Sequence, residues 1–159
     1  QIGDTIEFTS INPFRFKITG RTKHFINVFG EELMIENAIK AINIACVKTG
    51  AEINEWTAAP RFFEKEKSGV HEWVIEFEKE PDSLRSFTEL MDNTLKNLNS
   101  DYEAKRYKDI ILGMPIVTSV PKKTFYKWLK SKGKLGGQHK VPRLNNSRQY
   151  VEDILKIAE

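Results

Sequence analysis

The sequence predicts an α+β fold, a ferredoxin-like split β-α-β sandwich in which helices pack on a mixed or antiparallel sheet. Two short alternating segments flank Asn12-Pro13, and this pattern indicates a β-hairpin that precedes the sandwich. From residue 24 the periodicity of apolar residues follows the order strand, helix, strand, strand, helix, strand, which is the order of the split motif. Two segments with helical spacing follow the last strand, so we expect two extra C-terminal helices.

Each element follows from a local pattern. Strands are predicted where apolar and polar residues alternate, and helices where apolar residues recur every three or four positions. Thr49-Gly50 is typical of a helix C-cap, and Pro81 is typical of a helix start. The predicted strands are residues 6–9, 14–19, 24–29, 53–58, 71–78 and 114–120. The predicted helices are residues 31–49, 81–98, 102–108, 121–132 and 147–155.

The composition is that of a globular chain with an uneven charge. The 159 residues are 40% hydrophobic and 30% charged, which excludes a disordered or collagen-like chain. The net charge of +3 hides a block, because residues 111–148 carry nine basic residues and no acidic one. Such a block either attracts a phosphate-bearing partner or forms a solvated lysine-rich face. No apolar run reaches the ~18 residues of a membrane span, so we expect no membrane contact.

The residues that commonly carry chemistry do not form a complete catalytic set. The three histidines are far apart and have no ligand-type neighbours, so no metal site is predicted, and His71 is expected to be structural. The single cysteine, Cys46, is expected to be a buried, inert thiol, and it fits a reducing, cytoplasmic compartment. There is no GxSxG motif, phosphate-binding P-loop or GxGxxG motif. Two segments remain, 20–30 and 135–144, in which basic residues lie beside glycines.

These two segments carry a family resemblance. The first contains Gly20-Arg21-Thr22-Lys23 and Phe29-Gly30-Glu31-Glu32, and the second contains Gln138-His139-Lys140-Val141-Pro142-Arg143. In this order they resemble the carboxy-terminal domain of the auxin-responsive acyl-acid amido synthetases, the Gretchen Hagen family of the acyl-adenylate-forming superfamily. The resemblance covers essentially the whole chain and is bacterial in style. His139 and Val141 depart from the family's Gln-aromatic-Lys-Thr-Pro-Arg stretch.

The resemblance implies an ATP-dependent ligase that works in two half-reactions. An acyl acid attacks ATP to give an acyl-adenylate and pyrophosphate, and an amine, commonly an amino acid, then forms the amide and releases AMP. By position, Lys140 matches the catalytic lysine that reaches the α-phosphate or adenylate, and Lys23 matches the hinge. Arg21, Gln138 and Arg143 are implied to bind the nucleotide together with that lysine. Asn27 stands where related enzymes have a second-step lysine, so no second catalytic lysine is implied.

The resemblance also implies that most of the enzyme lies outside this chain. Residues 1–19 would be a β-hairpin and crossover from an N-terminal domain, and residues 20–159 the mobile C-terminal domain. ATP, with Mg²⁺, and the carboxylic acid and amino acid substrates would be bound mainly by that N-terminal domain. The chain starts at Gln1 rather than Met, which also predicts a piece of a longer protein. We therefore expect the chain to fold but to be inactive alone.

Two other functions are compatible with the residues. A nucleic-acid-binding module would use the basic block, with Phe125, Tyr126 and Trp128 among its lysines, but strand 71–78 is acidic where RNA-recognition motifs expose aromatic residues. A small-molecule regulatory domain of ferredoxin-like shape would bind its ligand at a dimer interface. The ligase reading is favoured, so we expect no nucleic acid among the partners.

Overall fold

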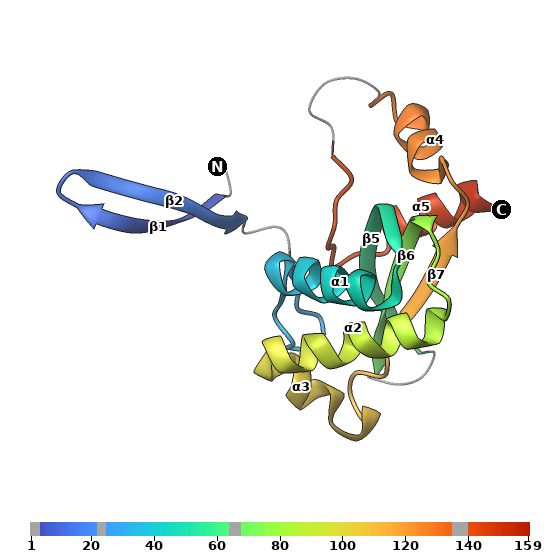
Figure 1. The fold of residues 1–159 in the computed structure, drawn as a ribbon, viewed down its shortest axis with the longest axis horizontal. Helices are drawn as coiled ribbons and strands as arrows, with labels where there is room; N and C mark the ends of the chain where they lie inside the picture. The colour runs from blue at the N-terminus through green and yellow to red at the C-terminus, as the bar shows by residue number, and fades with distance from the viewer. Residues whose placement is uncertain (1–3, 22–24, 64–67, 135–139) are drawn as a thin grey trace.

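The computed structural model describes residues 4–21, 25–63, 68–134 and 140–159, and these form a layered α+β fold with a projecting hairpin (Figure 1). None of the helices within these ranges is long and apolar enough to cross a membrane. The strands are β1 (Asp4–Ile11), β2 (Phe14–Arg21), β3 (Phe25–Ile26), β4 (Leu33–Met34), β5 (Glu52–Phe62), β6 (Gly69–Lys79) and β7 (Ile116–Val120). The helices are α1 (Ile35–Thr49), α2 (Leu84–Leu98), α3 (Ser100–Arg106), α4 (Thr124–Ser131) and α5 (Gln149–Ala158), with the 3₁₀ turn η1 (Tyr107–Asp109) after α3.

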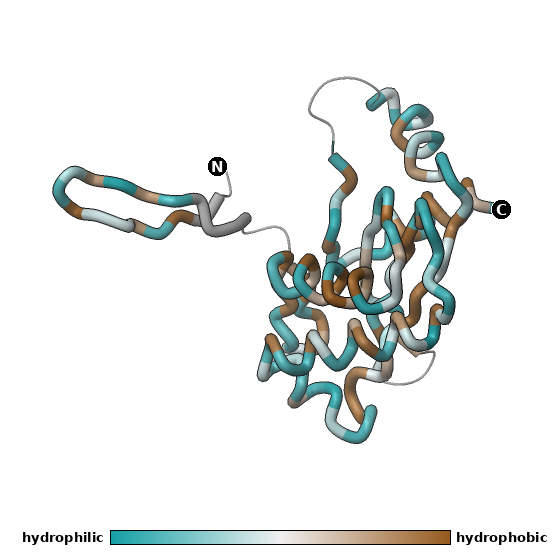
Figure 2. The backbone as a smooth tube through the Cα atoms, viewed as in Figure 1, coloured by the Kyte–Doolittle hydropathy of each residue, from teal (hydrophilic) through white to brown (hydrophobic). Residues whose placement is uncertain are grey.

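The central sheet has the order β5-β6-β7, and β6 is buried on both faces. Strand β5 is antiparallel to β6, and β7 is parallel to it. Along β6, Trp73, Ile75 and Phe77 belong to a core shared with α1 and α2. Val74 points to the opposite face and belongs to a second core with α4 and α5. Figure 2 shows hydrophobic and hydrophilic residues alternating along the helices and strands of this part of the chain. The predicted mixed sheet with helices, preceded by a hairpin and followed by two helices, is confirmed.

The segment predicted as strand 24–29 differs from its prediction. Within residues 25–29 it forms only the two-residue strand β3, which pairs with β4 outside the central sheet. A tight turn ends β3, because the Asn27 side chain accepts a hydrogen bond from the Glu32 backbone N–H (3.2 Å). Gly30 and Glu32 within this turn have positive φ angles of 80° and 38°. The first helix therefore begins at Ile35, later than the acidic residues suggested.

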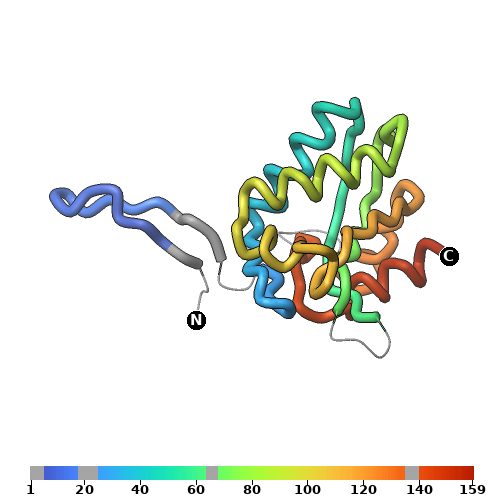
Figure 3. Tube along the Cα trace, turned by 90° about the horizontal axis from the view of Figure 1, so that it is seen from below, coloured from blue at the N-terminus to red at the C-terminus, as the bar shows by residue number. Residues whose placement is uncertain are grey.

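The hairpin of β1 and β2 is amphipathic and extends away from the rest of the chain (Figures 1 and 3). Phe8 is the cross-strand partner of Phe16, and the rings of Phe8 and Phe14 lie 6.1 Å apart, centroid to centroid. These three phenylalanines are 60%, 60% and 75% exposed. The cross-strand pair Glu7 and Lys17 forms an ion pair of 2.8 Å. A two-stranded hairpin is only marginally stable in water, so this one needs a further surface to cover its phenylalanines.

Two buried glutamates of β6 attach the C-terminal helices to the sheet. The Glu76 carboxylate accepts hydrogen bonds from the backbone N–H groups of Lys123 (2.9 Å) and Phe125 (3.1 Å) at the start of α4. An acidic group at this position is favoured by the helix dipole. Glu72 accepts a hydrogen bond from Arg148 (2.7 Å), the residue that precedes α5. These two acidic residues of β6 therefore hold the layer formed by α4 and α5.

Two further buried carboxylates hold the first layer. Glu31 and His71 are fully buried, and Oε1 of Glu31 lies 2.8 Å from Nε2 of His71. This contact agrees with the expected structural role of His71. Burial by itself raises the pKa of Glu31, but the hydrogen bond and charge of His71 hold that pKa below its ordinary value. Asp92 bonds to Tyr102 (2.8 Å) and Arg106 (2.8 Å). Burial by itself also raises the pKa of Asp92. Hydrogen bonds from Arg106, Lys96 and Tyr102 nevertheless hold that pKa below its ordinary value.

The buried carboxylates predict a loss of stability in acid. Because the pKa values of Glu31 and Asp92 are lower in the folded state, their stabilisation is fully present above the unfolded-state values of about 4. It is lost as the pH falls through the lower folded-state values. We expect the midpoint temperature of thermal unfolding, measured by circular dichroism, to fall steeply below about pH 4. Asp92→Ala should lower the free energy of unfolding by about 3 kcal/mol at pH 7, because the buried Arg106 keeps only the exposed Asp109 as a charged partner. An unchanged midpoint in this variant would contradict the assignment.

Candidate functional site

The structure places the sequence-predicted site residues unequally. Lys140 is exposed, and Arg143 is half-buried on the same segment. Arg21 is the last residue of β2, and its side chain lies outside the described part. Lys23 and Gln138 also lie outside the described residues, so their predicted roles stay predictions. The structural argument about the site therefore rests on the segment that begins at Lys140.

Residues 140–146, which we name the strap, lie against the edge of β5. The Ala58 N–H donates a hydrogen bond to the Arg143 carbonyl (2.7 Å), and the Asn145 N–H donates to the Ala58 carbonyl (3.1 Å). The Thr57 hydroxyl donates to the Pro142 carbonyl (2.6 Å). Ala58 and Leu144 form an isolated parallel bridge. The strap is thus hydrogen-bonded along the edge of the sheet.

Apolar side chains fasten the strap to both layers of the fold. Val141 is 3% exposed and belongs to the core under α4 and α5. Leu144 is 2% exposed and belongs to the core under α1 and α2. Burial of one such side chain is worth roughly 1.5–3 kcal/mol relative to leaving it exposed. The exposed Lys140 therefore directly precedes a residue that the second core holds in place.

The strap also meets the first of the two segments that the sequence singled out. The Asn27 N–H donates a hydrogen bond to the Asn146 side-chain oxygen (2.9 Å). The Asn146 amide nitrogen in turn donates to the Phe25 carbonyl (3.3 Å). Phe25 is the first described residue after the proposed hinge position. The fold thus brings Phe25 and Asn27 of the first segment beside Asn146, which lies two residues after the second segment.

Arg143 is held by three groups of β5. Its Nη1 donates to the Trp56 carbonyl (2.8 Å) and forms an ion pair with Glu55. The guanidinium carbon lies 5.0 Å from the centroid of the Trp56 ring, which is a cation–π distance. Burial lowers the pKa of Arg143, but a guanidinium stays charged at neutral pH. Its contacts within the chain are therefore those of an anchored side chain.

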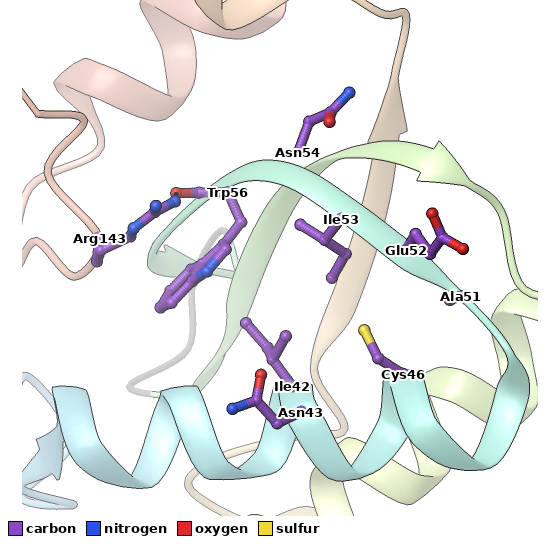
Figure 4. Close-up of a pocket in the computed structure, with 9 residues that line it drawn as sticks. All are labelled: Ile42, Asn43, Cys46, Ala51, Glu52, Ile53, Asn54, Trp56 and Arg143. Carbon is purple, nitrogen blue, oxygen red and sulfur yellow. Dashed lines mark hydrogen bonds between the residues drawn. The ribbon is translucent and has the colours of Figure 1, made fainter.

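A pocket of about 370 Å³ lies between α1 and β5, beside Arg143 (Figure 4). Ile42, Ile53 and Trp56 provide apolar walls, and the Cys46 thiol faces the space from α1. Cys46 is half-buried rather than fully buried, and burial raises the pKa of its thiol. A raised pKa keeps the thiol protonated and unreactive, in agreement with the expected inert role. Across the described ranges, no group of three or more His, Cys, Asp or Glu side chains is arranged to hold a metal ion.

Sequence reasoning missed the residues that hold the strap. Glu55, Trp56 and Thr57 are consecutive on β5, and Asn146 follows the basic segment. They contact partners that are 85 or more residues distant along the chain. The only sequence signal for any of them was the strand pattern of residues 53–58, which does not report what lies against the edge of that strand.

Comparisons with known proteins identify the family and the fold of the chain. The model of the GH3 family C-terminal domain matches residues 36–149. A solved structure of a GH3.15 acyl acid amido synthetase superposes with a TM-score of 0.76 at 17% identity, over 98% of this chain and 29% of that one. A second, AtGH3.15 acyl acid amido synthetase in complex with 2,4-DB, superposes with a TM-score of 0.74 at 16% identity, over 99% of this chain and 30% of that one. Among curated protein sequences, none matches. The chain spans less than a third of the two solved proteins.

The strap geometry predicts the effect of removing one hydroxyl. Thr57→Val keeps the side-chain shape but leaves the Pro142 carbonyl without its 2.6 Å hydrogen bond, which should cost about 1–2 kcal/mol. We expect faster hydrogen exchange of the Ala58 and Asn145 amides, which bond between strap and β5.

Thr94→Val is the matched control, because it removes a hydroxyl that bonds to the Leu90 carbonyl (2.7 Å) within α2. It should leave exchange in the strap unchanged. Equal exchange of the strap amides in the Thr57→Val variant and the unmodified chain would contradict the described anchoring.

Proposed function

The chain belongs to the GH3 family, whose C-terminal domain it contains, and from this premise we propose that it is the mobile C-terminal domain of an ATP-dependent acyl-acid amido synthetase. The complete enzyme joins an acyl acid to ATP, which forms the acyl-adenylate and releases pyrophosphate. The amine of an amino acid then attacks the acyl carbon of the adenylate, which forms the amide and releases AMP. Lys140 acts in the first of these steps.

The observation that carries this proposal is the placement of Lys140. Its side chain is exposed, whereas the next residue, Val141, is buried in the second core. A lysine ammonium is a compact charge that can reach a phosphate oxygen, and a cation placed where negative charge develops lowers the barrier to adenylation. The contacts of Asn146 with Phe25 and Asn27 attach the strap to the segment that follows the proposed hinge at Lys23. Rotation about that hinge would move Lys140 toward or away from the nucleotide.

The division of labour between two domains is part of the proposal. Residues 1–19 would pack on an N-terminal domain, and residues 20–159 would move as the small domain. Two observations support this division: the exposed Phe8, Phe14 and Phe16 of the hairpin, and the small share of the solved GH3.15 structures that the chain spans. An amphipathic hairpin of this kind is expected to bury its apolar face on a partner surface.

The residues of this chain fit part of an ATP site. Lys140 is an exposed cation that can bind a phosphate group, and Arg21 and Gln138 are proposed as further contacts to the nucleotide. The carboxylates described near the strap do not suit Mg²⁺, because Glu55 is engaged by Arg143 and Glu72 by Arg148. We therefore assign Mg²⁺, the adenine pocket and both substrate pockets to the N-terminal domain. A cytoplasmic location and a bacterial source stay predictions of the sequence.

The nucleic-acid alternative keeps only one of its three aromatic residues at the surface, Tyr126, which is 54% exposed. Phe125 and Trp128 are 2% and 1% exposed and belong to the second core, so they cannot stack on bases. Glu72 and Glu76 of the central strand are also buried and are bonded to the C-terminal helices. We therefore keep the ligase as the single proposed function.

Replacement of Lys140 tests the proposal in the full-length protein. Lys140→Ala should lower the rate of acyl-adenylate formation by about 10²–10³-fold, because it removes a cation from the site where charge develops. Amide formation from supplied acyl-adenylate should be retained. Both steps are measured separately, by ATP–pyrophosphate exchange and by single-turnover amide release. Lys40→Ala, an exposed lysine of α1, is the control of equal charge change. An unchanged adenylation rate in Lys140→Ala would rule out the assigned role.

The proposal also predicts what the isolated chain does. The 159 residues should give a cooperative unfolding transition but no ATP–pyrophosphate exchange with any acyl acid, because the substrate pockets belong to the other domain. Addition of the separately produced N-terminal domain should restore some ATP–pyrophosphate exchange, because the hairpin of β1 and β2 can then pack on that domain. Exchange catalysed by the purified chain alone would show that the division of labour is wrong.

A further inference from the structure

We propose that Glu55, Trp56 and Arg143 form a clamp that positions Lys140 for adenylation, and that Arg143 acts as a positioning residue rather than as a nucleotide ligand. This inference rests on the proposed function of Lys140, and it adds two β5 residues, Glu55 and Trp56, to the machinery of the reaction. The juxtaposition that carries it is the guanidinium held between a carboxylate, a carbonyl and an indole ring at the edge of the sheet.

The clamp is built on a rigid part of the molecule. Trp56 is 6% exposed, and its ring lies 5.4 Å from that of Trp73 in the central strand, centroid to centroid. Glu55 accepts a second hydrogen bond from the Trp56 N–H (3.2 Å), so its carboxylate is oriented by its own strand. The pairing of β5 with β6 is irregular between Ile53 and Glu55, and irregularities of this kind redirect the side chains of a strand. Both partners of Arg143 therefore belong to a strand that the central sheet holds in place.

The clamp restrains Lys140 because few bonds separate the two side chains. Lys140 precedes Arg143 by three residues, which an extended chain covers in about 10 Å. The residues between them have little freedom, since Val141 is buried and Pro142 has a ring-restricted φ and accepts the Thr57 hydrogen bond. The contacts of the Arg143 side chain thus add a further anchor to this short segment, three residues from Lys140.

The clamp also gives the two basic residues of the strap different roles. Lys140 and Arg143 are its two basic residues, and Glu55 neutralises the second of them. A planar guanidinium suits this task because it can bond to a carboxylate and a carbonyl while it stacks on an aromatic ring. Lys140 is left as the exposed cation that can meet a phosphate. Loss of the clamp would displace this cation, and a misplacement of about 1 Å can cost up to 10²-fold in rate.

The test is a double-mutant cycle in the full-length protein. Glu55→Gln should lower kcat for adenylation about 10-fold, with little change in KM for ATP, because it misplaces Lys140 without removing a substrate contact. In a Lys140→Ala background, Glu55→Gln should cause no further loss, because the residue that the clamp positions is already gone. Glu55→Asp should restore part of the rate. Glu89→Gln, which breaks an exposed ion pair with Arg85 on α2, is the control and should leave both backgrounds unchanged.

The possible failures are distinguishable. An unchanged adenylation rate in Lys140→Ala would reject the proposed function, and this clamp role with it. A strong effect of Lys140→Ala together with an unchanged Glu55→Gln, or with losses that multiply in the double variant, would reject the clamp alone. If Glu55→Gln fails to fold, as judged by its melting transition, Arg143→Lys takes its place in the cycle. This variant keeps the charge but loses the stacking and forked geometry, so it should give the same non-additive loss.

Discussion

The burial of β6 on both faces is the constraint on which the rest of the structure depends. A strand with two buried faces must satisfy two cores, and β6 does so by alternation: Trp73, Ile75 and Phe77 face α1 and α2, and Val74 faces α4 and α5. The second face also carries Glu72 and Glu76, whose burial would be costly without partners. The start of α4 and Arg148 provide these partners. The polar residues of β6 therefore determine where the last two helices lie.

The proposed site follows from that arrangement. The strap precedes α5 in the chain, and the Glu72 carboxylate anchors Arg148, the residue before that helix. Val141 is buried in the second core and Leu144 in the first. The strap therefore contacts both layers while it lies along the edge of β5. The free edge of a sheet is usually a liability, and here the strap covers part of it. The lysine proposed to act in adenylation thus directly precedes a segment whose side chains reach both cores.

Local patterns in the sequence predicted the elements well, because each was supported by residues close to it. Gly50 ends α1 in the left-handed conformation that a C-cap needs, and Ser83 caps α2 through a hydrogen bond to the Ser86 N–H (3.2 Å). The prediction of strand 24–29 fell short where a side chain, Asn27, hydrogen-bonds the backbone and begins a turn. The clamp could not be predicted, because Glu55 in a strand pattern looks like any solvent-facing acid. Its role appears only once Arg143, 88 residues later, is placed beside it.

The structure also shows that the basic block is partly neutralised by acidic residues from elsewhere in the chain. Of its nine cations, four form ion pairs with acidic residues outside the block: Lys122 with Glu78, Lys132 with Asp153, Arg143 with Glu55 and Arg148 with Glu72. The other five have no ion pair among the described residues, and they lie on or near α4 and at the start of the strap. A group of exposed lysines attracts anions over a distance of about a Debye length, ~8 Å at physiological salt. Such attraction acts on the approach of a phosphate-bearing molecule and does not discriminate between its atoms. Discrimination requires a cation held in place. In the proposed clamp Glu55 neutralises Arg143, and the anchored strap presents Lys140 as the exposed cation.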